Sequence, residues 1–105
     1  MNCFYSSFEF ASRRGLVYCE GWATSVDFPT WLGRPHAWCL DENDQVVDVA
    51  YSGRAIYGVV AYRGVAIPLD VAQAHTFRGS RGVLLAYEDD PELLRTAIKQ
   101  ANEWS

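Results

Sequence analysis

The spacing of the apolar residues changes at Gly15. Before that position, Phe4, Phe8 and Ala11 recur at the i, i+4 and i+7 spacing of one helical face, which predicts a helix over residues 3–13. Gly15 is expected to end this helix, because glycine readily adopts the left-handed conformation that follows a last helical turn. The remainder has a different pattern, so the chain combines a helix with a strand-rich segment.

Beyond Gly15, β-branched and aromatic residues alternate with short runs of turn-forming residues, which is typical of strands. Residues 69–76, after Pro68, are either a short helix or an irregular crossing. Asp89-Asp90-Pro91 has the composition of a helix start and predicts a last helix that ends near residue 103. The predicted strands occupy residues 16–23, 36–40, 45–51, 56–62, 65–67 and 83–87, and predicted loops include residues 27–35 and 79–82.

Size and charge restrict the classes of protein to which the chain can belong. With 105 residues, half of them hydrophobic, it is expected to form a single domain over residues 1–105. Nine basic residues stand against thirteen acidic ones, for a net charge of −4, and the basic residues form no cluster. We therefore expect no nucleic-acid partner, because binding to phosphate groups needs many basic contacts.

The cysteines and the apolar stretches bear on the compartment. Cys3, Cys19 and Cys39 are odd in number and lack CxxC spacing, which argues against a disulfide framework and against a zinc site. No apolar stretch approaches the roughly 18 residues that span a bilayer, and the first residues do not have the pattern of a secretory signal. We expect a cytoplasmic protein with no membrane partner, no metal and no cofactor.

One set of residues has the composition of a nucleophilic thiol site. Such a site needs a thiolate, a base for its proton and a third group that orients the base. Cys3 follows the predicted helix cap Asn2, so that the free amides of the first turn favour the anion and offer donors to an oxyanion. His36 begins one predicted strand and Asp48 lies near the middle of the next. These three residues are the catalytic candidates.

The register of the hairpin decides whether His36 and Asp48 meet, because directly opposed residues share a face of the sheet. If Leu40 pairs with Asp44 across a three-residue loop, His36 lies opposite Asp48. An even-numbered loop would put the two side chains on opposite faces. Asn43 favours the three-residue loop, because asparagine tolerates the left-handed conformation that such loops require.

These segments resemble known proteins. An acidic turn flanked by His36-Ala37-Trp38 and Val46-Val47-Asp48 resembles the histidine and aspartate segment of transglutaminase-like proteins in the papain-like cysteine superfamily. Small uncharacterised bacterial and phage proteins are similar over residues 3–67, at Cys3-Phe4, at residues 18–23, and at Tyr62-Arg63-Gly64-Val65. The chain departs from them at Asp48-Val49-Ala50, where they tend to have Asp-Pro-Thr, and only Met1 and Asn2 stand upstream of Cys3, where related enzymes often place an oxyanion-stabilising side chain.

The resemblance implies an α+β fold in which an N-terminal helix bearing Cys3 packs on an antiparallel β-sheet, and the chain adds a C-terminal helix. It implies that Cys3 is the nucleophile, His36 the general base and acid, and Asp48 the orienting carboxylate. The predicted activity is that of a hydrolase or an acyl or amine transferase on an amide, isopeptide or acyl carbonyl of a protein or peptide-like substrate. Hydrolysis and transfer share the first half-reaction, so both remain open.

Other aromatic, histidine and cysteine residues are assigned lesser roles. Trp31, in the loop before His36, is a candidate substrate contact or lid, and Trp38, on the face of His36, is a candidate to contact substrate and shield the site from water. Cys19 and Cys39 are expected in the core, and His75 at the surface or at a helix end. The alternative function is a non-catalytic module of this fold that binds a protein, such as a phage-encoded inhibitor of a host protein.

Overall fold

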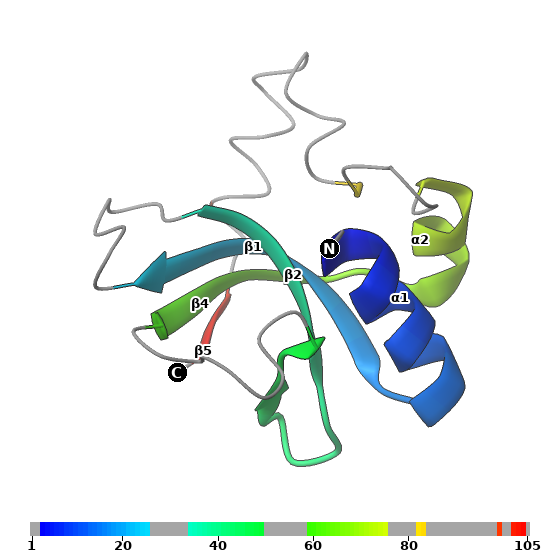
Figure 1. The fold of residues 1–105 in the computed structure, drawn as a ribbon, viewed down its shortest axis with the longest axis horizontal. Coiled ribbons are helices and arrows are strands. Elements are labelled where there is room, and N and C mark those ends of the chain that lie inside the picture. The colour runs from blue at the N-terminus through cyan, green and yellow to red at the C-terminus, as the bar shows by residue number, and fades with distance from the viewer. Residues whose placement is uncertain are drawn as a thin grey trace.

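The protein has the α+β architecture predicted from its sequence, with helices on an antiparallel sheet. The computed structural model describes residues 3–25, 34–49, 59–75, 82–83, 99 and 102–104. Within them, a five-stranded sheet has the order β3-β2-β1-β4-β5, with every neighbouring pair antiparallel (Figure 1). The elements are α1 (Cys3–Arg14), β1 (Val17–Ser25), β2 (Arg34–Leu40), β3 (Val46–Val47), β4 (Val59–Ala66), α2 (Leu69–His75) and β5 (Asn102–Trp104).

Helix α1 forms and ends as its sequence predicts. Its buried face carries Phe4, Ser7 and Ala11, one helical turn apart. Gly15 has a φ of 67°, and the amide of Leu16 donates to the carbonyl oxygen of Ala11 at 3.1 Å. This backbone geometry is a Schellman end, in which a left-handed glycine lets the chain turn out of the helix. The predicted cap Asn2 lies outside the described residues.

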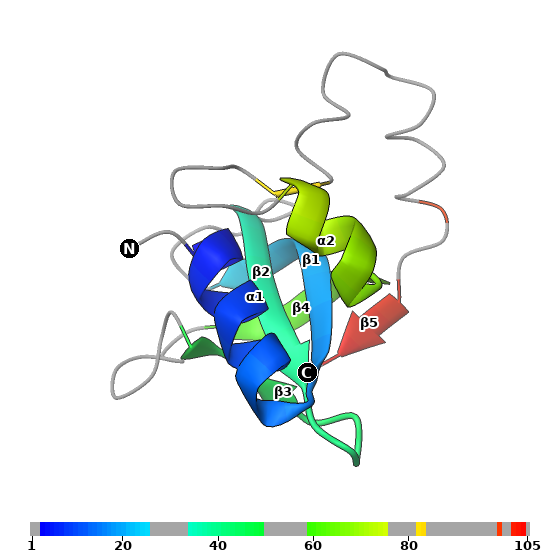
Figure 2. The same cartoon turned by 90° about the vertical axis from the view of Figure 1, so that its right-hand side faces the viewer.

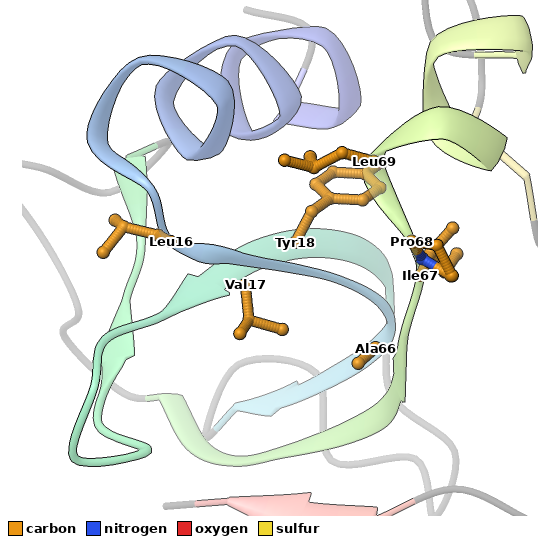
Figure 3. A pocket seen from close by; sticks show the side chains of 7 residues that line it. All are labelled: Leu16, Val17, Tyr18, Ala66, Ile67, Pro68 and Leu69. Atoms are coloured by element: carbon orange, nitrogen blue, oxygen red, sulfur yellow. The ribbon is translucent and has the colours of Figure 1, made fainter.

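The two faces of the sheet bury different sets of side chains, because neighbouring residues of a strand point to opposite sides. Val17 and Tyr18 show this alternation at the start of β1 (Figure 3). Both helices lie on one face of the sheet (Figure 2). The core beneath them includes Phe4, Ala11, Tyr18, Trp22, Ala37, Cys39, Ile67 and Ala72. The opposite face buries a second cluster, made of Cys19, Ala23, Trp38, Leu40 and Tyr62.

Helix α1 is attached to β2 by two buried hydrogen bonds. The hydroxyl of Ser7 donates to the carbonyl oxygen of Ala37 at 3.2 Å, and the thiol of Cys39 donates to the carbonyl oxygen of Ser7 at 3.2 Å. Cys19 and Cys39 both have no exposed surface, so the prediction that they are core residues is confirmed. Cys39 therefore serves as a small core side chain that also joins the helix to the sheet.

Strand β4 differs from its prediction, which divided it at Arg63-Gly64. It runs unbroken from Val59 to Ala66. Gly64 pairs with Gly21 of β1, and a Cβ atom on Gly64 would lie 2.7 Å from Cη2 of Trp38 and closer still to the backbone of Glu20. The glycine is therefore needed for a close approach of backbone and indole ring, and it does not mark a turn.

Other boundaries also differ from the sequence-based prediction. The second strand of the hairpin is reduced to Val46–Val47, and Val83 belongs to a turn. Residues 69–75 form a helix, α2, which resolves the alternative left open, and His75 is at its end, as predicted. The last predicted helix lies mostly outside the described residues, although Lys99 is helical. It ends earlier than predicted, because Asn102–Trp104 is strand β5 and pairs with β4.

Replacement of Gly64 tests the close packing in the middle of the sheet. Gly64→Ala is expected to lower the free energy of unfolding by about 3 kcal/mol, because the new methyl group collides with backbone that cannot move aside easily. Gly15→Ala is the control: it has open space around it and should cost only about 1 kcal/mol, from its left-handed φ. Urea unfolding measures both values, and equal losses would contradict this role of Gly64.

Candidate functional site

His36 lies on the face of the sheet opposite to the helices. It is 5% exposed and pairs with Gly21 of β1. Trp38, two residues further along β2, stacks on the imidazole with ring centroids 6.2 Å apart and an angle of 22° between the planes. Tyr62 of β4 approaches both rings, with its centroid 6.2 Å from that of His36 and 5.0 Å from that of Trp38. The aromatic rings of Trp38 and Tyr62 therefore enclose the inner side of His36.

The hairpin that supplies Asp48 has a different register from the predicted one. Leu40 pairs with Val46, not with Asp44, so the connection has five residues, Asp41–Gln45, and not three. The shift is by two positions, and residues two apart share a face. His36 and Asp48 therefore still lie on the same face, although they are not directly opposite. Asp48 follows β3 directly and is not in the middle of a strand.

The side chain of Asp41 explains the longer turn. Its Oδ1 atom accepts hydrogen bonds from the amides of Asn43, at 2.8 Å, and Gln45, at 3.0 Å. The residue in the left-handed region is Asp44, with a φ of 58°, and not Asn43 as predicted. Aspartate tolerates this conformation and satisfies nearby amides, which stabilises a five-residue connection.

His36 and Asp48 form a buried pair that Tyr62 completes. Nε2 of His36 lies 2.7 Å from Oδ2 of Asp48, and the hydroxyl of Tyr62 donates to the same oxygen at 2.8 Å. Asp48 is 8% exposed, so its carboxylate needs hydrogen-bond donors in place of water, and these two side chains supply such contacts. Because an ionised carboxylate only accepts, Nε2 carries a proton, and Nδ1 is the ring nitrogen that faces away from Asp48.

Cys3 is the third member of this group. It occupies the first position of α1, is half-buried against the core, and lies close enough to His36 to contribute to the raised pKa of the imidazole. Helix α1 begins beside β2, the strand that carries His36 (Figures 1 and 2). The structure thus brings Cys3, His36 and Asp48, the three residues singled out in the sequence, into one chain of contacts.

The charge state of His36 follows from its surroundings. Burial by itself lowers the pKa of the imidazole, but hydrogen bonds to Asp48 and Cys3, together with the negative charges of both, outweigh burial and raise the pKa from 6.5 to about 9. The protonated ring is therefore the main form at neutral pH.

The other two thiols have the opposite environment. Burial, the largest cause, raises the pKa of both Cys19 and Cys39 to about 12, and nearby negative charges add to the effect. Both thiols are therefore protonated and enclosed at neutral pH. Of the three cysteines, Cys3 alone combines partial exposure with a histidine partner.

Neither tryptophan predicted to contact substrate is shown in that role. Trp38 has no exposed surface, so it shields the inner side of His36 and has no surface to offer a substrate. Trp31 lies outside the described residues. Within the part of the chain that the structure describes, no three His, Cys, Asp or Glu residues are grouped to hold a metal ion, and no helix there is long and apolar enough to cross a membrane.

An apolar pocket of about 340 Å³ lies apart from this group. It is formed by Leu16–Tyr18 at the start of β1 and Ala66–Leu69 at the junction of β4 and α2 (Figure 3). The hydroxyl of Tyr18 is the one side-chain polar group among these residues, and it donates to Glu20. The pocket therefore contains no group suited to acid, base or nucleophilic chemistry.

Two residues with buried side-chain hydrogen bonds, one on each face of the sheet, have no role predicted from the sequence. Tyr62 appeared only within the string that carries the family resemblance, and its contact with Asp48 joins β4 to a hairpin on the far side of β1. Glu20 was read as one position of a strand, and it is a fully buried carboxylate. A charged residue inside an otherwise apolar strand is the signal that could have identified it.

Comparisons with protein-family models, with curated proteins and with solved structures find no match to this chain. The resemblance to transglutaminase-like proteins therefore stays a prediction.

The raised pKa of His36 predicts a pH-dependent stability. Because folding favours the protonated ring, the stability from this group is complete below the ordinary pKa of 6.5 and is lost as the pH rises through about 9. Urea unfolding across this range should show a falling free energy of unfolding, with a smaller slope in His36→Gln. His75→Gln, at the other histidine, should keep the slope of the unchanged protein; an unchanged slope in His36→Gln would refute the assignment.

The charge of Asp48 is predicted to hold the proton on His36. In Asp48→Asn, burial remains while the charged partner is lost, so the pKa of His36 should fall from about 9 by roughly one unit or more. Titration of the imidazole resonances by NMR measures it. Asp44→Asn removes an exposed carboxylate of the same hairpin, at a φ that asparagine accepts, and should leave the His36 titration unchanged.

Proposed function

We propose that this chain is a thiol-dependent hydrolase or acyl or amine transferase of the transglutaminase-like type. Its substrate would be an amide, isopeptide or acyl carbonyl of a protein or peptide. The observation that carries the proposal is the contact chain from Cys3 through His36 to Asp48, with the pKa of His36 raised to about 9. A protonated imidazole beside a thiol supports a thiolate and imidazolium pair at neutral pH, which is the attacking form in thiol catalysis.

The proposed reaction has two halves. Sγ of Cys3 attacks the carbonyl carbon, and the oxyanion that forms lies near the free amides at the start of α1. The tetrahedral intermediate collapses with loss of the amine, which takes a proton from Nδ1 of His36, and a thioester remains on Cys3. Water or a second amine then attacks the thioester and gives a proton back to His36, so the thiolate leaves and the pair is restored.

Asp48 and Tyr62 act on this reaction through His36. The carboxylate holds Nε2, which directs Nδ1 toward Cys3 and stabilises the positive ring. Tyr62 fixes the carboxylate oxygen that accepts from His36. Because Cys3, Cys19 and Cys39 are all free thiols, we assign this chemistry to a reducing compartment, the cytoplasm.

The reactivity of Cys3 tests the proposal directly. Alkylation by iodoacetamide, resolved by residue with mass spectrometry, should already be fast at about pH 6.5 and change little up to about pH 8, whereas a free thiol gains nearly tenfold per pH unit in that range. His36→Ala should slow the reaction at the lower pH by roughly 100-fold. Cys19 and Cys39 serve as internal controls, because burial protects both.

Trapping of an intermediate completes the test. Incubation with small amide and thioester acyl donors should add the acyl mass to Cys3, and the adduct should be absent in Cys3→Ser. A Cys3 that behaves as an ordinary thiol, equally in the unchanged protein and in His36→Ala, would contradict the enzyme proposal and favour a protein that acts by binding alone.

A further inference from the structure

Glu20 is a buried acidic residue that the proposed reaction does not use. It lies on β1, on the face covered by the helices, and has no exposed surface. Burial of a carboxylate is unfavourable unless hydrogen-bond donors compensate for the lost water. The identity of these donors therefore indicates what the residue holds in place.

Two hydrogen-bond donors bind the same oxygen of Glu20. The hydroxyl of Tyr18 lies 2.6 Å from Oε2, and the backbone amide of Val83 lies 2.9 Å from it. Tyr18 is a near neighbour on the same strand, whereas Val83 is 63 positions further along the chain. Glu20 thus attaches a distant turn, Gly82–Val83, to the centre of the sheet.

This turn is packed against the first turn of α1. Gly82 has a φ of 81°, and a Cβ atom on it would meet the ring of Phe4 on one side and lie 2.8 Å from Cδ of Glu20 on the other. Gly82 therefore fills the space between Glu20 and Phe4. Phe4 directly follows Cys3, and the turn lies at the N-terminal end of α1 in Figure 1.

Separate contacts fix the start, the middle and the end of α1. The two hydrogen bonds at Ser7 attach its middle to β2, and the Schellman turn at Gly15 sets its end. Within the described residues, Gly82–Val83 is the turn packed at the start of the helix, where Cys3 must meet His36. A displacement of about 1 Å at such a point can cost a site up to roughly 100-fold in rate.

We propose that Glu20 is a positioning residue for Cys3. By holding the Gly82–Val83 turn against Phe4, it fixes the first turn of α1 and thereby the distance between the thiol and His36. The inference rests on the proposed function, and it adds a second buried carboxylate, on the opposite face of the sheet from Asp48, to the groups on which that function depends.

Three substitutions test this role. Glu20→Gln keeps the shape but weakens the bond to Val83, because a neutral acceptor holds an amide less strongly than a carboxylate. Gly82→Ala displaces the turn while every hydrogen-bonding group remains. Tyr18→Phe is the matched control, since it removes the other donor to Oε2 and leaves the turn bonded.

The readout is Cys3 alkylation at two pH values, together with labelling of Cys19 and Cys39. Glu20→Gln and Gly82→Ala should slow alkylation of Cys3 roughly tenfold at about pH 6.5, where the rate depends on His36. At pH 9.5, where a thiol of ordinary pKa is ionised without a histidine partner, the rate should change less than about twofold. In Tyr18→Phe, the rate of Cys3 alkylation should stay within about twofold of that in the unchanged protein at both pH values. Cys19 and Cys39 should remain protected in all three variants.

Two results would overturn the role of Glu20. One is an unchanged rate at the lower pH in both Glu20→Gln and Gly82→Ala. The other is that Cys19 and Cys39 become labelled as the rate of Cys3 alkylation falls. The core would then have loosened as a whole, and Glu20 would be a structural residue only. A slow Cys3 at the lower pH in the unchanged protein would instead contradict the proposed function itself, so the two failures are distinguished.

Discussion

The structure depends on the compensation of a buried carboxylate, that of Asp48. A charge removed from water is tolerated only with well-placed donors, and here these donors are His36 of β2 and Tyr62 of β4. The bond between Asp48 and His36 also orients the imidazole, and with Cys3 it raises the pKa of the ring to about 9. Stability and the proposed chemistry therefore rest on one set of atoms, and neither can be altered alone.

The sequence predicted the parts of this arrangement that depend on local spacing. Helix α1 and its end at Gly15 follow from the apolar period and from glycine's conformational freedom. The common face of His36 and Asp48 required only an odd-numbered loop, so it survived a register that was wrong by two positions. The exact loop length could not be predicted, because it depends on the hydrogen bonds that the side chain of Asp41 accepts from two backbone amides of the turn.

What could not be predicted depends on contacts between distant segments. Gly64 has the local signature of a turn, and its place within β4 becomes intelligible only when the indole of Trp38, from another strand, is packed above it. Tyr62 and Glu20 likewise have partners that no spacing along the chain indicates. In each case the decisive neighbour is brought in by the order of the strands, with β1 in the centre.

The bond between Glu20 and the amide of Val83 also bears on the order of events during synthesis. Cys3, His36 and Asp48 all lie in the first half of the chain and are made early. The contact that packs the start of α1 can form only after residue 83 has left the ribosome, and closing so long a loop comes late in folding because of its entropic cost. With Glu20 positioning Cys3 as proposed, a nascent chain carries its thiol before that thiol is held beside its histidine, which delays any reactivity until residue 83 has joined the fold.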